Sequence, residues 1–159
     1  MLEQLSTEAD HLLKNHGLKL VTAESCTGGG VAYLITQIPG SSSWFDRGFV
    51  TYSNSAKMQM LGVPSSTLDT FGAVSEETAQ AMAEGALQHS DAEISVAITG
   101  VAGPNGGSTE KPVGTVWFAW SYKNKSTVTK LKNFSGNRVE IREQALEVAL
   151  RGIIEIIKS

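Results

Sequence analysis

The residues best suited to chemistry surround Ser25, within the stretch TAESCTGGG at positions 22–30. An apolar strand is expected before this stretch, over residues 18–23, and an apolar helix follows it from Val31. Backbone N–H groups at a helix start favour anions and developing oxyanions, so Ser25 lies where a serine nucleophile would be effective. Serine and threonine also cap helices routinely. The stretch by itself therefore predicts either a nucleophile or a helix cap.

A second polar cluster, TYSNSAK at positions 51–57, follows another expected strand, residues 48–51, and opens another helix. Its Lys57 can act as the base for a serine hydroxyl once burial lowers the pKa of the amine. Its Tyr52 can relay the proton or steady the lysine. A solvated lysine and a half-buried tyrosine are the ordinary alternatives. Both clusters nevertheless fall at the strand-to-helix edge where open α/β sheets collect their ligands, which favours a joint site with Ser25.

Five separated motifs of the chain occur in the order found in a known family. They are TAESCTGG at 22–29, FVTYSN at 49–54 with Lys57 after it, GAVS at 72–75, TGVAGPNGG at 99–107 and KPVGTV at 111–116. Through them nearly the whole chain closely resembles the CinA C-terminal domain family. That family includes nicotinamide-nucleotide amidases, which hydrolyse nicotinamide mononucleotide to nicotinic acid mononucleotide and ammonia. The resemblance implies a small-molecule nucleotide substrate, Ser25 as nucleophile, Lys57 as base and Tyr52 as the assisting group.

Other residues near these motifs are predicted to contact the substrate. The resemblance places Thr99 in the substrate site, and backbone N–H groups of residues 26–28 are expected to hold the oxyanion. Glu24 can position Lys57 or a water molecule, or it can satisfy backbone N–H groups at the helix start. The predicted substrate contacts in this part of the chain are Glu24, Thr27, Gly28, Thr99 and Gly100.

Two arginines, Arg138 and Arg142, are four residues apart and share a face near the start of the last expected helix. Cations at that end oppose the helix dipole unless an anion is present. A guanidinium and helix-start N–H groups both complement phosphate oxygens, so the pair is predicted to bind the substrate phosphate. The resemblance likewise implies an arginine there in the substrate site. Surface ion pairs with Glu140 or Glu143 are the alternative.

Composition narrows the functional classes. A chain of 159 residues fits a single domain, residues 1–159, and the formal net charge of −3 argues against a nucleic-acid surface. No apolar run reaches membrane-spanning length and the first residues do not read as a secretion signal, so a cytoplasmic location is expected. A single cysteine, Cys26, forms no internal disulfide, and no Cys/His spacing suggests a metal site. No cofactor is expected.

Three other interpretations of the chain remain open. Cys26 is an alternative nucleophile, because thiolates form readily at helix starts, although no histidine lies at a comparable edge. A catalytically silent nucleotide-binding or regulatory module would also use the elbow, the glycine-rich turn at residues 25–30. The glycine spacing in this turn is that of neither a Walker loop nor a Rossmann fingerprint. The apolar last helix supports an assembly protein or a homo-oligomer.

The elements that must position these residues alternate between helix and strand. Apolar spacing predicts a first helix from Leu2 to a stop at Gly17, and a last helix over residues 137–157 that lies deep in the domain or meets another subunit. Residues 94–98 are predicted to form a central strand, and residues 115–122 and 126–133 an antiparallel hairpin. The expected fold is a three-layer α/β/α domain with a mixed, mostly parallel sheet. The resemblance implies five strands, one of them antiparallel.

Two further segments carry predictions. The loop over residues 101–114 is long enough to cover a ligand, with a plain connector as the alternative. Trp44 and Phe45 are placed in a loop and are predicted to anchor the core, with a lid or a subunit contact as the alternative.

Overall fold

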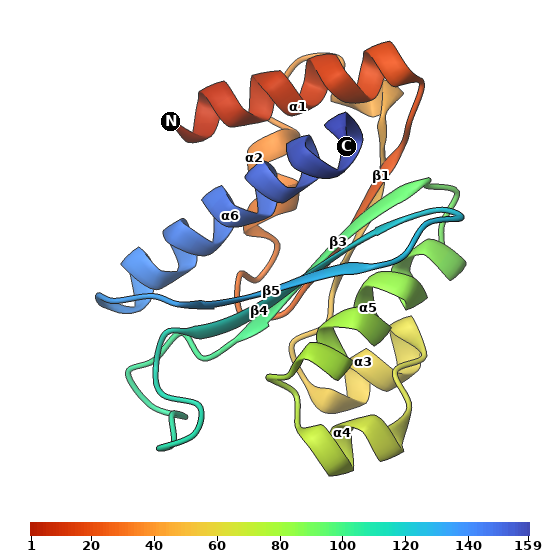
Figure 1. The fold of residues 1–159 in the computed structure, drawn as a ribbon. Helices are drawn as coiled ribbons and strands as arrows, with labels where there is room; N and C mark the ends of the chain where they lie inside the picture. Colours follow the sequence, from red (N-terminus) through yellow and green to blue (C-terminus); the bar gives the residue numbers. More distant parts are fainter.

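A five-stranded sheet with helices on both faces forms the protein, in a computed structural model that describes residues 1–159 (Figure 1). The strands lie in the order β2-β1-β3-β4-β5. Their bounds are β1 Leu20–Glu24, β2 Phe45–Val50, β3 Ile94–Gly100, β4 Thr115–Tyr122 and β5 Val128–Asn133. The helices are α1 Leu2–His16, α2 Gly30–Ile35, η1 Ser41–Ser43, α3 Asn54–Leu61, α4 Ser65–Phe71, α5 Glu76–Gln88 and α6 Arg138–Lys158.

The central strand β3 shows why the domain has three layers. Ile94, Val96 and Ile98 are buried in the larger apolar cluster, which includes residues of α1 and α6. On the opposite face Ala97 belongs to the cluster under α5, and the Ser95 hydroxyl donates to the carbonyl of Ala83 in that helix at 2.7 Å. Helices α1, α2 and α6 therefore cover one face and α3, α4 and α5 the other (Figure 1). The predicted three-layer fold is confirmed.

Strand directions bring three chain segments to one edge of the sheet. Strands β1, β2 and β3 are parallel, and Glu24 at the end of β1 lies opposite Val50 of β2 and Ile98 of β3. Strand β4 runs antiparallel to both β3 and β5, which makes it the single reversed strand of the five. Because parallel strands end at the same edge, the segments after β1, β2 and β3 meet there.

Trp44 anchors α1 to the body of the domain. Its side chain is buried, and its indole N–H donates to the Asp10 carboxylate of α1 at 2.6 Å. The predicted core role of this residue is confirmed. The predicted start of the second strand is wrong. Phe45 is the first residue of β2, whereas the strand was expected to begin at residue 48. Strand β2 is an edge strand that pairs with β1 alone, so it tolerates polar residues that resemble a turn.

The last helix, α6, lies deep in the domain. One side of it is buried along its length, including Ile141, Ala149 and Ile153, and it packs against α1, β3 and β4. Most of its apolar surface is thus covered within this chain, although Val139 near its start is exposed. Of the two predicted placements, burial in the domain is the one observed.

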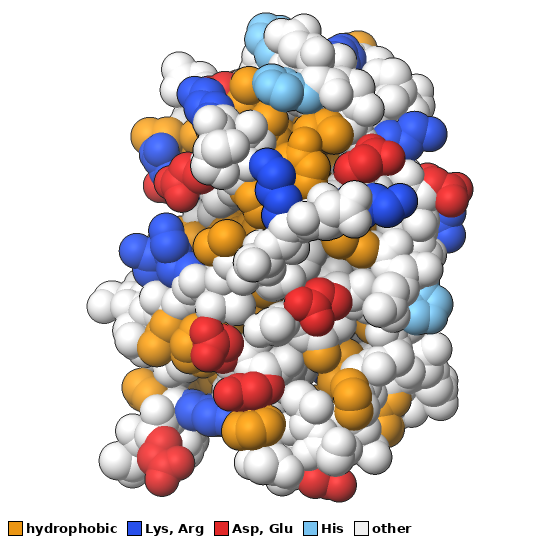
Figure 2. All heavy atoms as spheres, turned by 45° about the vertical axis from the view of Figure 1, so that its right-hand side comes forward, with side chains coloured by type: hydrophobic (Ala, Val, Ile, Leu, Met, Phe, Trp, Pro, Cys, Tyr) orange, Lys and Arg blue, Asp and Glu red, His pale blue; other side chains and the backbone are white.

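Two surface properties complete the description. On the face in Figure 2, Lys and Arg side chains are interspersed with Asp and Glu side chains and form no single basic patch. None of the helices combines the length and apolar character that crossing a bilayer requires.

Candidate active site

Ser25 and Lys57 meet at the edge where β1 and β2 end. Ser25 directly follows β1, and Lys57 lies in α3, whose first turn is capped by the Ser53 hydroxyl accepting from the Ala56 N–H. The Lys57 Nζ lies 3.0 Å from the Ser25 Oγ. Both side chains are buried, with 1% of Lys57 and 8% of Ser25 exposed. A hydroxyl and an amine at this distance can exchange a proton directly.

The surroundings of Lys57 suit a neutral amine. Burial lowers the pKa of Lys57 below its ordinary value, and no carboxylate forms an ion pair with it. Its Nζ donates to the carbonyls of Thr51 at 2.9 Å and Tyr52 at 3.3 Å. A neutral amine has two N–H bonds and one lone pair. With both N–H bonds on these carbonyls, the lone pair is left for the Ser25 hydroxyl proton.

Tyr52 lies at the mouth of the site, with 60% of its side chain exposed. Its hydroxyl accepts from Nη2 of Arg138 at 2.9 Å, and Nη1 of Arg138 donates to the carbonyl of Gly103 at 2.7 Å. The tyrosine hydroxyl makes no hydrogen bond to Ser25 or Lys57. Tyr52 contacts the lysine amine through its backbone carbonyl alone, and the direct distance between Ser25 and Lys57 requires no relay.

Glu24 stabilises the elbow after β1 through hydrogen bonds to its buried carboxylate. Its side chain is fully buried, and Oε1 accepts from the Thr27 hydroxyl at 2.6 Å and from the Val31 N–H at 2.9 Å. The other oxygen accepts from the Ala32 N–H at 3.1 Å. The carboxylate therefore satisfies the backbone at the start of α2, the second of the two roles that the sequence left open.

Two backbone N–H groups beside Ser25 are free to hold an oxyanion. The Ser25 N–H donates to the carbonyl of Ile98, and the Gly28 N–H donates to the carbonyl of Ser25, both at 3.0 Å. The N–H groups of Cys26 and Thr27 make no hydrogen bond to another residue. Of the three predicted oxyanion donors, Gly28 is thus already engaged and Cys26 and Thr27 remain.

A cavity of about 280 Å³ opens over this pair of side chains. Six of the predicted site residues line it: Ser25, Tyr52, Lys57, Thr99, Gly100 and Arg138. Four do not line it: Glu24, Thr27, Gly28 and Arg142. Thr99 is itself tied to the wall, because its hydroxyl donates to the carbonyl of Ala73 at 2.8 Å. The structure therefore brings six of the predicted residues together in one cavity, and the other four lie outside its lining.

The two arginines of α6 have different surroundings, and neither forms an ion pair with Glu140 or Glu143. Arg138 lines the cavity, whereas half-buried Arg142 donates from Nε to the carbonyl of Cys26 at 3.1 Å and from Nη2 to that of Thr27 at 3.3 Å. The alternative of surface ion pairs is thus not what the structure shows. Only Arg138 is exposed at the cavity, where it can meet an anion.

Comparison with known proteins identifies the family of the chain. A family model of the CinA C-terminal domain matches residues 2–157 of the chain. The chain belongs to the CinA C-terminal domain family.

Relatives of this CinA domain include proteins named for an enzymatic activity. Nicotinamide-nucleotide amidohydrolase PncC of Enterobacter agglomerans is 51% identical over 158 residues, covering 97% of this chain and 96% of the relative. The protein of the same name from Escherichia coli K12 is 54% identical over 150 residues, covering 94% of this chain and 91% of the relative. A solved structure, competence/damage inducible protein CihA from Agrobacterium tumefaciens, superposes with a TM-score of 0.96 at 46% identity. That superposition covers 99% of this chain and 96% of the other.

Some of the cavity wall in this CinA domain was not singled out from the sequence. Ala73 and Val74 line it, as do residues 101–103, 105 and 106 of the long loop. These residues carry no reactive side chain, so only their place in the quoted motifs GAVS and TGVAGPNGG could have indicated them. The loop itself was predicted to cover a ligand, and part of it lies against the cavity.

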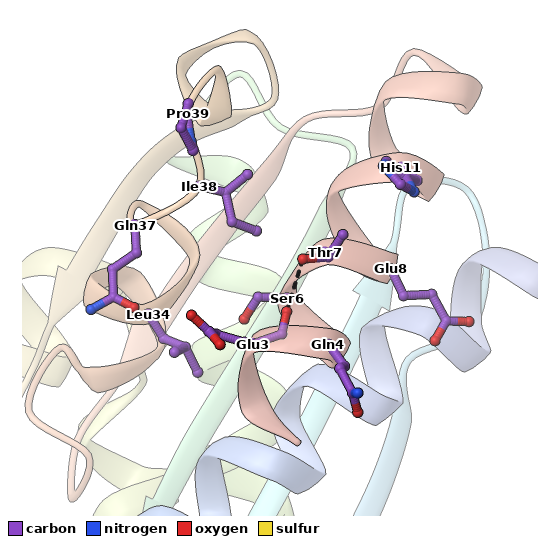
Figure 3. A pocket seen from close by; sticks show the side chains of 10 residues that line it. All are labelled: Glu3, Gln4, Ser6, Thr7, Glu8, His11, Leu34, Gln37, Ile38 and Pro39. Carbon is purple, nitrogen blue, oxygen red and sulfur yellow. Dashed lines mark hydrogen bonds between the residues drawn. The ribbon is translucent and has the colours of Figure 1, made fainter.

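A larger hollow of about 660 Å³ lies between α1 and α2 of the CinA domain (Figure 3). Its lining contains no lysine. Its two hydroxyls, on Ser6 and Thr7, donate to main-chain carbonyls one turn earlier in α1. No group of three or more His, Cys, Asp or Glu side chains in the protein is placed to hold a metal ion. The cavity at Ser25 is the one in which a serine hydroxyl is hydrogen-bonded to a lysine amine.

Proposed function

We propose that this protein is a nicotinamide-nucleotide amidase. It hydrolyses the carboxamide of nicotinamide mononucleotide to nicotinic acid mononucleotide and ammonia, as a step in pyridine nucleotide recycling. The observation that carries the proposal is the 3.0 Å contact between Lys57 Nζ and Ser25 Oγ, both buried and both lining one cavity. The names of the relatives at 51% and 54% identity supply the substrate.

In the first half of the proposed reaction, neutral Lys57 accepts the Ser25 proton as Oγ attacks the carboxamide carbon. The N–H groups of Cys26 and Thr27 hold the oxyanion of the tetrahedral intermediate. Each such donor is worth about 3 to 4 kcal/mol of barrier in serine hydrolases. The intermediate collapses with cleavage of the C–N bond, and the Lys57 ammonium gives its proton to the departing nitrogen. Ammonia leaves, and the nicotinoyl group remains on Ser25 as an ester.

In the second half, water replaces ammonia at the same position. Lys57, neutral again, takes a proton from the water as its oxygen attacks the ester carbon. The C–O bond to Ser25 breaks, and the serine oxygen recovers a proton from Lys57. The reaction consumes only water, so its chemistry calls for no cofactor.

Recognition of the nucleotide phosphate is assigned to Arg138. Its guanidinium lines the cavity, has no carboxylate partner and is bound to the Tyr52 hydroxyl and the Gly103 carbonyl. A planar fork of N–H donors matches the oxygens of a phosphate. Tyr52 assists by orienting this guanidinium at the mouth, and buried Thr99 forms part of the cavity wall. Glu24, Thr27 and Gly28 support the elbow that carries the nucleophile.

The test is to incubate the purified chain, with a metal chelator, with nicotinamide mononucleotide and to measure ammonia and nicotinic acid mononucleotide. We expect both products in equal amounts, undiminished by the chelator. Arg138→Gln is expected to raise KM by about tenfold or more, since a charge-assisted phosphate contact is worth about 1.5 to 3 kcal/mol. Tight binding of the nucleotide with no ammonia released would instead identify a silent binding module.

A further inference from the structure

Arg142 is a half-buried cation with no carboxylate partner, and the proposed chemistry does not yet use it. The side chain is half-buried, forms no ion pair and does not line the cavity. Its two hydrogen bonds go to backbone carbonyls of the elbow after β1, those of Cys26 and Thr27. A charged donor is therefore committed to a four-residue segment that contains the nucleophile.

The first of these bonds acts on the Thr27 N–H. The carbonyl of Cys26, which accepts from Arg142 Nε at 3.1 Å, belongs to the same planar peptide as the N–H of Thr27. Fixing the oxygen therefore fixes the direction of the N–H. A charged donor on the carbonyl also polarises the peptide and makes its N–H a stronger donor. That N–H has no partner within the protein.

The second bond reaches the Cys26 N–H through one more peptide. Arg142 Nη2 donates to the carbonyl of Thr27 at 3.3 Å, and the N–H of that same peptide, on Gly28, donates to the carbonyl of Ser25 at 3.0 Å. The Ser25 carbonyl in turn shares its peptide with the N–H of Cys26, which donates to no other residue. Hydrogen bonds in such a chain strengthen one another by about 10 to 30% each.

The N–H groups of Cys26 and Thr27 are thus each linked to the Arg142 guanidinium through a short series of peptides and hydrogen bonds. The positive charge of Arg142 also acts on Cys26. Burial raises the pKa of the Cys26 thiol to about 11, and the charge of Arg142 opposes that rise. From the other side, the Thr27 hydroxyl is held by buried Glu24 at 2.6 Å. The elbow is therefore fixed by Arg142 on its carbonyls and by Glu24 on a side chain.

We propose that Arg142 is a positioning residue for the oxyanion hole rather than a phosphate ligand. It orients and polarises the peptides whose N–H groups, on Cys26 and Thr27, receive the developing negative charge. This inference rests on the proposed serine mechanism, but on no particular substrate. Such a residue acts on the transition state more than on the bound substrate, so its loss lowers kcat and leaves KM nearly unchanged.

The test uses a probe that needs the nucleophile and the oxyanion hole but no nucleotide contact. An alkyl fluorophosphonate phosphonylates an activated serine: the Ser25 oxygen bonds to phosphorus, fluoride leaves and the hydroxyl proton passes to Lys57. We expect Arg142→Gln to slow labelling of Ser25 by about tenfold or more, by analogy with weakened oxyanion donors. Arg142→Lys, which keeps the charge but loses the fork, should fall between Arg142→Gln and wild type. Arg151→Gln, the same change on an exposed residue of α6, is the matched control and should label at the wild-type rate.

The outcomes separate this inference from the proposed function. Labelling of Arg142→Gln at the wild-type rate overturns the role of Arg142 even if the protein is an amidase. With nicotinamide mononucleotide, a raised KM at unchanged kcat also overturns it, because that result describes a substrate contact. If wild type is labelled at Ser25 yet releases no ammonia from this nucleotide, the proposed substrate fails while the labelling comparison still decides the role of Arg142. Should Arg142→Gln not fold, Arg142→Lys against wild type decides, with an equal rate overturning the role.

Discussion

At the scale of single residues, burial makes the lysine a base. An exposed lysine is protonated at neutral pH and cannot accept the serine proton. Lys57 is 1% exposed, faces two carbonyls and a hydroxyl, and has its pKa lowered by burial. The neighbouring Cys26 is affected in the opposite sense, because burial raises the pKa of its thiol to about 11 and keeps it protonated. Burial thus favours the reactive form of one side chain and the inert form of the other.

This difference predicts the pH dependence of activity. Only neutral Lys57 can act as the base, so kcat/KM for nicotinamide mononucleotide should be lost as pH falls through the lowered pKa of Lys57 and should level off above it. The midpoint should lie below the ordinary pKa of lysine, because burial moves it down. Initial rates measured across a pH series at low substrate concentration give this midpoint. A midpoint at or above the ordinary lysine pKa, or no acid limb at all, would show that Lys57 is not the base.

Most of the side chains that line the cavity with a reactive or polar group could be predicted from the sequence. Ser25, Tyr52, Lys57, Thr99 and Arg138 were all predicted, and all line one cavity. What the sequence did not distinguish was which arginine of the pair reaches the cavity. Arg138 and Arg142 are about one helical turn apart in α6. Arg142 contacts the Cys26 carbonyl whereas Arg138 contacts the Gly103 carbonyl, and both contacts join segments far apart in the sequence.

At the scale of elements, close packing of α6 on the sheet fixes where its arginines lie. Trp120 of β4 is buried, its indole N–H donates to the carbonyl of Ala149 at 3.1 Å, and its ring is stacked on Phe118 with centroids 5.7 Å apart. Gly152 of α6 lies directly against that ring, and a Cβ there would overlap the indole. The absence of a side chain at Gly152 is therefore what lets the helix approach.

Gly152→Ala is expected to destabilise the fold although alanine is the better helix former. The gain in helix propensity is about 1 kcal/mol, whereas forcing a methyl group into a packed core costs about 1 to 3 kcal/mol and often shifts the backbone. Since the indole is held on both sides, we expect a net loss of up to about 2 kcal/mol in the free energy of unfolding. Urea unfolding measures it, with Glu155→Ala on the exposed side of α6 as the control. A variant more stable than wild type would mean that the sheet and helix can separate freely.

Several elements were predictable because their patterns are local. The first helix and the central strand at residues 94–98, which lies within β3, follow from neighbouring residues, and each was confirmed. Strand β2 was placed too late, since Asp46 and Arg47 look like turn residues. They are tolerated because the strand lies at the sheet edge, and that position follows from the pairing of distant strands.

At the scale of the whole molecule, the sheet brings the nucleophile and base together. Ser25 follows β1 and Lys57 follows β2, and these strands are parallel neighbours although the two residues are 32 positions apart. Thr99 is the second-last residue of β3, on the other side of β1, and Arg138 is the first residue of α6. The sequence predicted that such an edge would exist but gave no strand order, because pairing partners are set by the packing of both faces at once.

The most direct test of the account compares ammonia release from nicotinamide mononucleotide by wild type, Ser25→Ala, Cys26→Ala and Lys57→Met, each shown to be folded by circular dichroism. The account predicts that Ser25→Ala and Lys57→Met lose at least about 10³-fold in kcat, as when a nucleophile or its base is removed, while Cys26→Ala stays within about tenfold of wild type. Turnover that survives in Ser25→Ala and disappears in Cys26→Ala would contradict the account and assign the nucleophile to the thiol.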